Sequence, residues 1–168
     1  MTAIVKTIVL LFLLFPGQLR ALASDGDQPI EVEADSLEVR ESERISIYQG
    51  NVKLIQGSLQ ISSERLVIRF NADNELQVIE MTGAPARFRQ LDDDQIEMLG
   101  EAAQIDYTES QSLLVLRGSA RFSHAGDIIE SEMIRVNTES NSIKAGSSES
   151  DERVKMLIQP RQDSKSSE

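Results

Sequence analysis

The chain has 168 residues, which is enough for one domain with a sizeable core, and it contains no cysteine, so disulfides cannot stabilise it. It carries 17 Lys and Arg against 28 Asp and Glu, a net charge of −11. A surface this acidic repels nucleic acid and anionic headgroups, which argues against nucleic-acid binding. An anionic lipid would have to be held by its tails.

Residues 1–23 have the features of a cleaved secretory signal peptide. An apolar run follows Lys6 and ends at Pro16, and a small-x-small cleavage pattern ends at Ala23. The alternative is a membrane anchor, which needs about 20 continuous apolar residues. We therefore expect export to the periplasm of a chain that begins at Ser24, with 15 basic residues against 28 acidic ones and a net charge of −13.

Two motifs alternate along the mature chain. The first is an acid flanked by aliphatic positions, and its copies are 29, 37 and 31 residues apart. The second is an apolar stretch that runs into a glycine. Recurrence of this kind indicates a repeat protein. The acids are Asp35, Glu64, Glu101 and Glu132, and the glycines are Gly50, Gly83 and Gly118.

Within each unit, apolar residues alternate with polar ones, as at Ile45 and Ile47 or Leu66 and Ile68. A period of two over short runs bounded by turn residues is typical of β-strands, and no segment shows a convincing helical stripe. Because one face of each strand is apolar, the strands must close over those faces. We predict an elongated all-β domain over 24–160, open at both ends and built from about four repeats, followed by a disordered tail over 161–168.

Five short motifs occur in a specific order and spacing, and through them the chain resembles a known family, the periplasmic lipopolysaccharide-transport bridge proteins of the LptA/OstA family. The resemblance is close over 27–88 and looser from there to Pro160. It implies a twisted β-jellyroll whose hydrophobic V-shaped groove shields the acyl chains of lipopolysaccharide between the inner and outer membranes. The motifs are Asp27-Gln-Pro-Ile30, Gly50-Asn-Val52, Gln56-Gly57 before Leu59, Ser63-Glu64 before Leu66, and Gly83-Ala-Pro-Ala-Arg-Phe88.

The same resemblance implies partners. In that family an inner-membrane-anchored component docks on the first strand, an outer-membrane assembly protein docks on the last, and copies join head to tail. An unpaired strand edge can accept a partner strand by β-augmentation, so both end strands are expected docking edges. The residues expected there are Ile30 and Val32 at the first edge and Val154, Met156 and Ile158 at the last.

The predicted lipid-binding residues combine two sources. The resemblance places Ile30 and Val32 at the entrance and Phe88 and Tyr107 further along, whereas alternation alone puts the others on apolar faces. The aromatic residues have a simpler interpretation as core side chains, which stays open. The complete predicted set is Ile30, Val32, Val39, Ile47, Val52, Leu54, Ile61, Leu66, Ile68, Phe88, Met98, Ile105, Tyr107, Leu116 and Phe122.

Little in the sequence indicates catalysis. His124 is the only histidine and there is no cysteine, so a nucleophile has no visible base and orienting group. Asp92-Asp-Asp94 lacks the ligand spacing of a calcium loop, and the recurring acids are more simply turn caps or solvent-facing groups. We expect no enzyme activity, cofactor or metal. The remaining alternatives are a related module of the same transport system, such as the soluble part of its membrane-anchored component, and a structural or carbohydrate-binding β-solenoid of the cell envelope.

Overall fold

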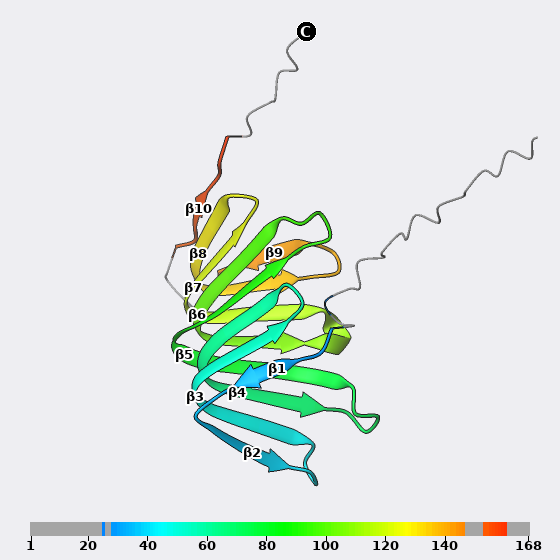
Figure 1. Ribbon diagram of the computed structural model, residues 1–168. Coiled ribbons are helices and arrows are strands. Elements are labelled where there is room, and N and C mark those ends of the chain that lie inside the picture. Colours follow the sequence, from blue (N-terminus) through cyan, green and yellow to red (C-terminus); the bar gives the residue numbers. More distant parts are fainter. Residues whose placement is uncertain (1–24, 26–27, 147–152, 161–168) are drawn as a thin grey trace, which may run out of the picture.

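In a computed structural model, the described residues are Asp25, 28–146 and 153–160. The predicted signal peptide and the predicted C-terminal tail lie outside them. The described strands form one antiparallel sheet, in the order β1-β3-β4-β5-β6-β7-β8-β10, with β2 also on β3 and β9 also on β8 (Figure 1). The strands are β1 (Glu31–Glu33), β2 (Ser36–Arg40), β3 (Ile45–Gln56), β4 (Leu59–Phe70), β5 (Leu76–Leu91), β6 (Glu97–Thr108), β7 (Leu113–His124), β8 (Asp127–Asn137), β9 (Ser142–Ala145) and β10 (Lys155–Leu157); the short helix η2 (Glu109–Gln111) precedes β7.

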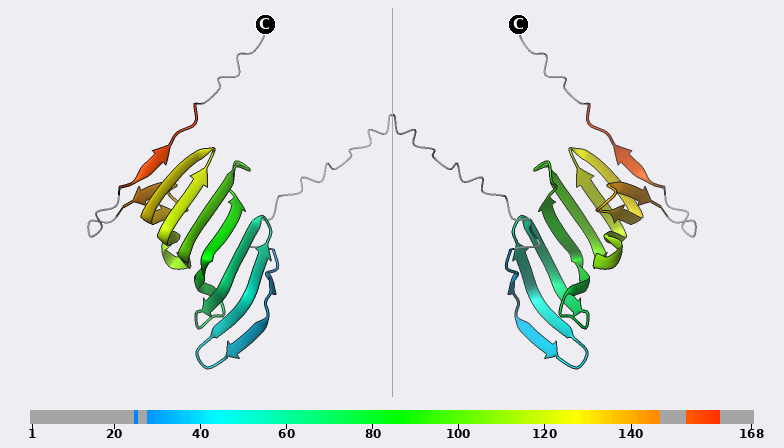
Figure 2. Two further views of the ribbon diagram at one scale, coloured as in Figure 1. Left: turned by 90° about the vertical axis from the view of Figure 1, so that its left-hand side faces the viewer. Right: turned by 90° about the vertical axis from the view of Figure 1, so that its right-hand side faces the viewer.

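The long strands bend near their middles, and the sheet folds along that line into two arms (Figure 2). The ladder is interrupted in each of the strand pairs from β3/β4 to β7/β8. Such bulges bend strands and increase their twist. We call the two halves the first arm (31–33, 52–63, 86–102, 120–131 and 155–157) and the second arm (36–49, 65–82, 104–117 and 133–145).

Special backbone residues make the bends. Gly50 and Gly118 have φ values of 78° and 80°, in the left-handed region that glycine tolerates. Pro85 lies inside β5. It sits in the gap of the ladder between Thr82 and Ala86, where its missing N–H costs no ladder bond.

The recurring acids also belong to the bends. The amide of Asp35 donates to the Gly50 carbonyl (2.9 Å), and the Asn51 side chain donates to the Asp35 carboxylate (2.8 Å). At the equivalent place in β8, the Glu132 carboxylate faces the Ser119 amide at 3.4 Å. These acids therefore help to hold the fold line, in keeping with their interpretation as turn caps.

The core lies between the two arms, and it is tightest along the fold line. Side chains from both arms meet there, and Leu66, Ile105, Leu116 and Ile134 have no exposed surface. Burial of apolar surface on this scale is the main stabilising term for a chain without disulfides. The all-β fold is confirmed, whereas the division into four repeats remains a prediction.

Candidate functional site

Away from the fold line, the arms separate and enclose a cavity of about 1160 Å³. Pockets for drug-sized ligands are typically about 300–1,000 Å³, so this space is suited to a large ligand. Its deep wall is apolar, and its rim is polar and mainly acidic. The deep wall includes Leu59, Ile61, Phe70, Leu76, Ile79, Met81, Phe88, Met98, Tyr107, Leu114, Phe122 and Val136, and the rim includes Asp25, Glu75, Asp92, Asp93, Asp94, Glu109 and Glu139.

The predicted lipid-binding residues fall into separate groups. Six line the cavity: Ile30, Ile61, Phe88, Met98, Tyr107 and Phe122. Another seven lie deeper, in the packed core or against it: Val32, Val52, Leu54, Leu66, Ile68, Ile105 and Leu116. Val39 is more than half exposed, on the inner face of β2 at the open N-terminal end of the sheet.

Ile47 lies on the opposite face of the sheet, so the structure does not bring it to the cavity. Ile47 pairs with Val67, and these two residues form a small separate cluster with Ile45. The next pair along the strands is Tyr48 with Leu66, which faces the core. Successive residues of a strand point to opposite faces, so Ile47 must point outward.

The predicted set omits several residues of the cavity wall, of which Ile79, Met81, Leu114 and Val136 are buried. Their signal was present in the sequence, because Ile79 and Met81 alternate and Leu114 belongs to an apolar run before Gly118. What could not be read from the sequence is the change of face at each bend. In β4, Ile61 and Leu66 both face inward although they are an odd number of residues apart.

Two aromatic rings and one glycine form the middle of the wall on the first arm. Gly100 is paired with Phe88 on one side and Phe122 on the other. A Cβ atom at Gly100 would overlap the ring of Phe88. The two ring centroids are 6.4 Å apart, within the range of favourable aromatic pairs. Gly100 therefore gives the Phe88 ring its place against the sheet.

The polar rim holds its acids through specific bonds. Hydrogen bonding to the His124 ring (2.7 Å) and to the Ile96 amide lowers the pKa of Asp92. Asp92 also accepts from the amide of Asp94, so its oxygens brace the loop. Among the described residues, no group of three or more His, Asp or Glu side chains is placed to hold a metal ion.

Also on the rim, Asp25 fastens the N-terminal segment to the first arm. Its carboxylate accepts from the Ser58 amide (2.7 Å), the Ser58 hydroxyl (2.6 Å) and the Gln90 side chain (3.1 Å). Burial alone would raise the pKa of Asp25, but these hydrogen bonds outweigh it and lower the pKa. The first residues of the described chain thus lie at the mouth of the cavity.

The tyrosine of the wall is uncharged at physiological pH. Burial is the main cause that raises the pKa of Tyr107 to about 12, and the neighbouring Glu109 carboxylate adds to it. The phenol therefore presents an apolar ring to the cavity and a neutral hydroxyl to the rim.

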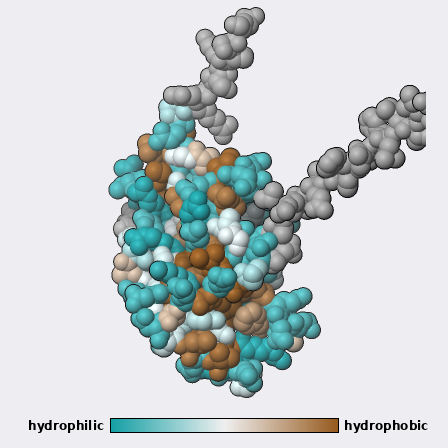
Figure 3. Space-filling model, in the orientation of Figure 1, coloured by the Kyte–Doolittle hydropathy of each residue, from teal (hydrophilic) through white to brown (hydrophobic). Residues whose placement is uncertain are grey.

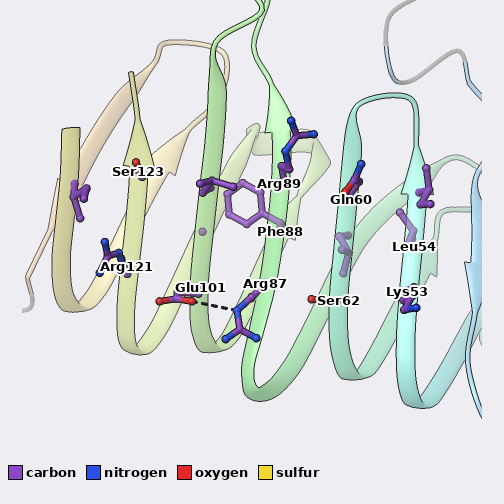
Figure 4. A pocket seen from close by; sticks show the side chains of 15 residues that line it. Lys53, Leu54, Gln60, Ser62, Arg87, Phe88, Arg89, Glu101, Arg121 and Ser123 are labelled. Carbon is purple, nitrogen blue, oxygen red and sulfur yellow. Dashed lines mark hydrogen bonds and ion pairs between the residues drawn. The ribbon is translucent and has the colours of Figure 1, made fainter. Parts of the chain in front are cut away.

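The outer face of the first arm has a shallower hollow of about 670 Å³, which Figure 4 shows from close by. Charged side chains cross it from strand to strand, including Lys53, Arg87, Glu101 and Arg121. Arg87 and Glu101 form an ion pair at 3.2 Å. Three of its four cations, Arg87, Arg89 and Arg121, form ion pairs with neighbouring acids.

Among the described strands, the sheet ends in unpaired edges at both extremities. β1 and β2 form one end, and β9 and β10 form the other (Figures 1 and 2). Large apolar side chains are exposed at both ends. Figure 3 shows those at the end that carries β2 as a hydrophobic patch. They are Ile30, Leu37 and Val39 at the first end and Ile143, Val154, Met156, Leu157 and Ile158 at the second.

The comparisons with known proteins agree with this architecture. The family model for "LptA/(LptD N-terminal domain) LPS transport protein" matches residues 31–142. The chain belongs to this family. The match runs from the start of β1 to the start of β9 and so includes most of the residues that line the cavity.

Similar proteins carry related names. The lipopolysaccharide export system protein LptH of Pseudomonas aeruginosa is 29% identical over 150 residues, which cover 84% of this chain and 85% of that protein. LptA of Escherichia coli K12 is 28% identical over 143 residues, covering 84% and 77%. The crystal structure of LptH, described as the periplasmic component of a lipopolysaccharide transport device, superposes with a TM-score of 0.73 at 28% identity, over 82% of this chain and all of that one.

Proposed function

We propose that this protein is a periplasmic lipopolysaccharide carrier that shelters the acyl chains of lipid A between its arms and passes the lipid from the inner to the outer membrane. The observation that carries the proposal is the cavity: an apolar wall opening to an acidic rim. Family membership and the names of the relatives support it. No helix among the described residues has both the length and the apolar character needed to cross a bilayer.

The charge distribution determines how such a lipid is held. Asp and Glu residues surround the mouth, so phosphate groups are repelled from it. Each buried CH₂ contributes about 0.8 kcal/mol, and several acyl chains together supply ample affinity without any pairing to the headgroup. The lipid would lie with its chains in the cavity and its phosphates and sugars outside. The energy for directional movement must come from a partner.

We further propose that the two ends are docking edges. In the described part of the chain, the backbone edge at each end has no pairing strand and large apolar side chains there are exposed, as an incoming strand requires. The edge of β1 and β2 would receive the inner-membrane-anchored component, and the edge of β9 and β10 the outer-membrane assembly protein. Copies joined head to tail would make one continuous cavity.

Two adjacent residues allow a matched test of the lipid site. Met98 lines the cavity, whereas Leu99 lies on the outer face. We expect Met98→Glu to weaken binding of purified lipopolysaccharide at least tenfold, because an acid then faces the acyl chains, and Leu99→Glu to leave binding unchanged. Circular dichroism checks that both variants fold. Equal losses in the two variants, or none in either, would contradict the proposed site.

The carbohydrate-binding alternative predicts a different binding result. Such a protein would bind the sugar portion of lipopolysaccharide after the acyl chains have been removed. We expect deacylated lipopolysaccharide to compete poorly with the intact lipid. Competition at equal concentration would favour the carbohydrate-binding function.

A further inference from the structure

A row of charged side chains crosses the whole outer face of the first arm. Starting at the N-terminal edge, directly opposed residues in successive strands read Glu33, Lys53, Ser62, Arg87, Glu101, Arg121, Glu130 and Lys155. Figure 4 shows its middle members in line. Arg87 pairs with Glu101 at 3.2 Å and Arg121 with Glu130 at 3.1 Å. The row begins with an acid and ends with a lysine.

The second arm repeats this polarity at its edges. The corresponding row begins with Glu38 on β2 and ends with Arg135 and Lys144 on β8 and β9. The residues between them are Ile47, Val67, Glu80, Asp106 and Val115. Each arm therefore has one such row, which begins with an acid at the first edge of the sheet and ends with a lysine at the last edge.

The inner face carries a matching apolar row next to the charged one. On the first arm it runs from Val32 through the aromatic pair to Met156. Val32 precedes Glu33 and Met156 follows Lys155, so an antiparallel joint that aligns the charges also aligns these two side chains. The strand order makes β10 of one copy antiparallel to β1 of a second copy stacked in the same orientation. One register thus satisfies both faces.

We infer that these rows fix the register and the direction of a joint between two copies of this chain, with Lys155 of one opposite Glu33 of the next and Lys144 opposite Glu38. The inference rests on the head-to-tail docking proposed above and specifies its geometry. None of the ion pairs found in the described part of the chain uses Glu31, Glu33, Lys144 or Lys155, although Glu38 also contacts Arg40 at 2.7 Å.

The same charges disfavour wrong joints. Two first edges would bring Glu31, Glu33 and Glu38 against their own copies, and two last edges would oppose lysines. A slip of two residues in either direction keeps the inner faces together but separates Lys144 from Glu38. In one direction it also separates Lys155 from Glu33, whereas in the other it moves Lys155 to Glu31 and places Arg153 opposite Glu33, so the pair on the second arm is what distinguishes that register. Exposed ion pairs add little affinity, but like charges placed directly opposite each other are destabilising, so such pairs select among alternatives. A different protein that docks on β1 would need a cation opposite Glu33.

Because the chain has no cysteine, single cysteines can report the register. Chains with Val32→Cys are mixed with chains carrying Met156→Cys, Val154→Cys or Ile158→Cys under mild oxidation. Directly opposed residues lie about 4.5–5.5 Å apart at Cα, which suits a disulfide, whereas a two-residue offset does not. We expect the 32/156 mixture to cross-link at least tenfold faster than the 32/154 and 32/158 mixtures.

Charge reversal then tests whether the charged rows set this register. Glu33→Lys with Glu38→Lys, added to the Val32→Cys chain, should slow cross-linking about tenfold. Lys155→Glu with Lys144→Glu, added to the Met156→Cys chain, should restore the rate. The control, Asp73→Lys with Glu97→Lys, makes the same change of charge away from both edges and should have no effect. Equal cross-linking in offset mixtures, or no rescue, would overturn the inference.

A strictly monomeric protein would also overturn it. Lipopolysaccharide binding is measured on the same single-cysteine chains, so a monomer that still binds lipid refutes the joint and leaves the carrier function standing. Loss of lipid binding in chains that cross-link in register would refute the carrier function alone.

Discussion

Replacing Gly100 with alanine places one methyl group where the Phe88 ring now lies. The added Cβ would be 2.7 and 2.8 Å from two ring carbons and closer still to a third, so the ring must move by about 1–2 Å to reach van der Waals contact near 3.5–4.0 Å. Phe88 is buried and sits beside Phe122, and the open side is the cavity. The ring should therefore be pushed into the space proposed for the acyl chains.

We expect Gly100→Ala to destabilise the fold by about 1–3 kcal/mol, the usual cost of overpacking, and to lower the melting temperature by about 3–9 °C. Lipopolysaccharide binding should weaken in parallel. The assays are thermal unfolding followed by circular dichroism and a lipid-binding titration. Ser62→Ala, on the exposed outer face of the same arm, is the control and should change neither quantity.

A smaller partner should relieve the clash. In Phe88→Leu the ring is absent, so adding Gly100→Ala to that variant should cost less than adding it to the natural chain. A coupling energy of about 1 kcal/mol or more in this double-mutant cycle is expected. Full additivity, or an unchanged melting temperature in Gly100→Ala, would refute the contact on which the reasoning depends.

Three further predictions concern the rim. The neutral Tyr107 phenol is favoured in the folded state, so its contribution to stability should be present below pH 10 and lost as the pH rises from 10 towards 12. In an absorbance titration, Tyr107→Phe should remove the phenolate signal that appears near pH 12. Because the pKa of Asp92 is lowered, the contribution of this carboxylate to stability should be present above its ordinary pKa of 3.8 and be lost as the pH falls below it. In His124→Ala, a carboxyl NMR titration should show the Asp92 pKa rising towards that value, and an unchanged pKa would contradict the hydrogen bond. Asp25→Ala should speed hydrogen exchange at the Ser58 amide, with no such change in Asp73→Ala.

Local patterns in the sequence were sufficient to predict much of the fold. Period-two alternation predicts strands, and it places Ile61, Phe88 and Phe122 on the apolar face that the structure turns inward. The order of the motifs predicts the family, which the comparisons confirm. These features could be read because each depends on neighbours within one strand.

The bends could not be predicted in the same way. A bulge shifts the phase of alternation, so residues before and after it reach the same face from odd and even positions. This is why Ile47, which alternates as well as any lining residue, lies on the outer face. The charged rows could not be predicted from the sequence either, because only the register of the strands brings their residues together.

The central claim is that lipid occupies the space between the arms, and site-specific photo-crosslinking tests it most directly. A photoreactive residue is placed at Phe88 or Tyr107 inside the cavity, and at Ile47 or Val67 on the outer face. We expect lipopolysaccharide adducts at the first two positions and none at the second two. Adducts of equal yield on both faces, or at Ile47 and Val67 alone, would contradict it.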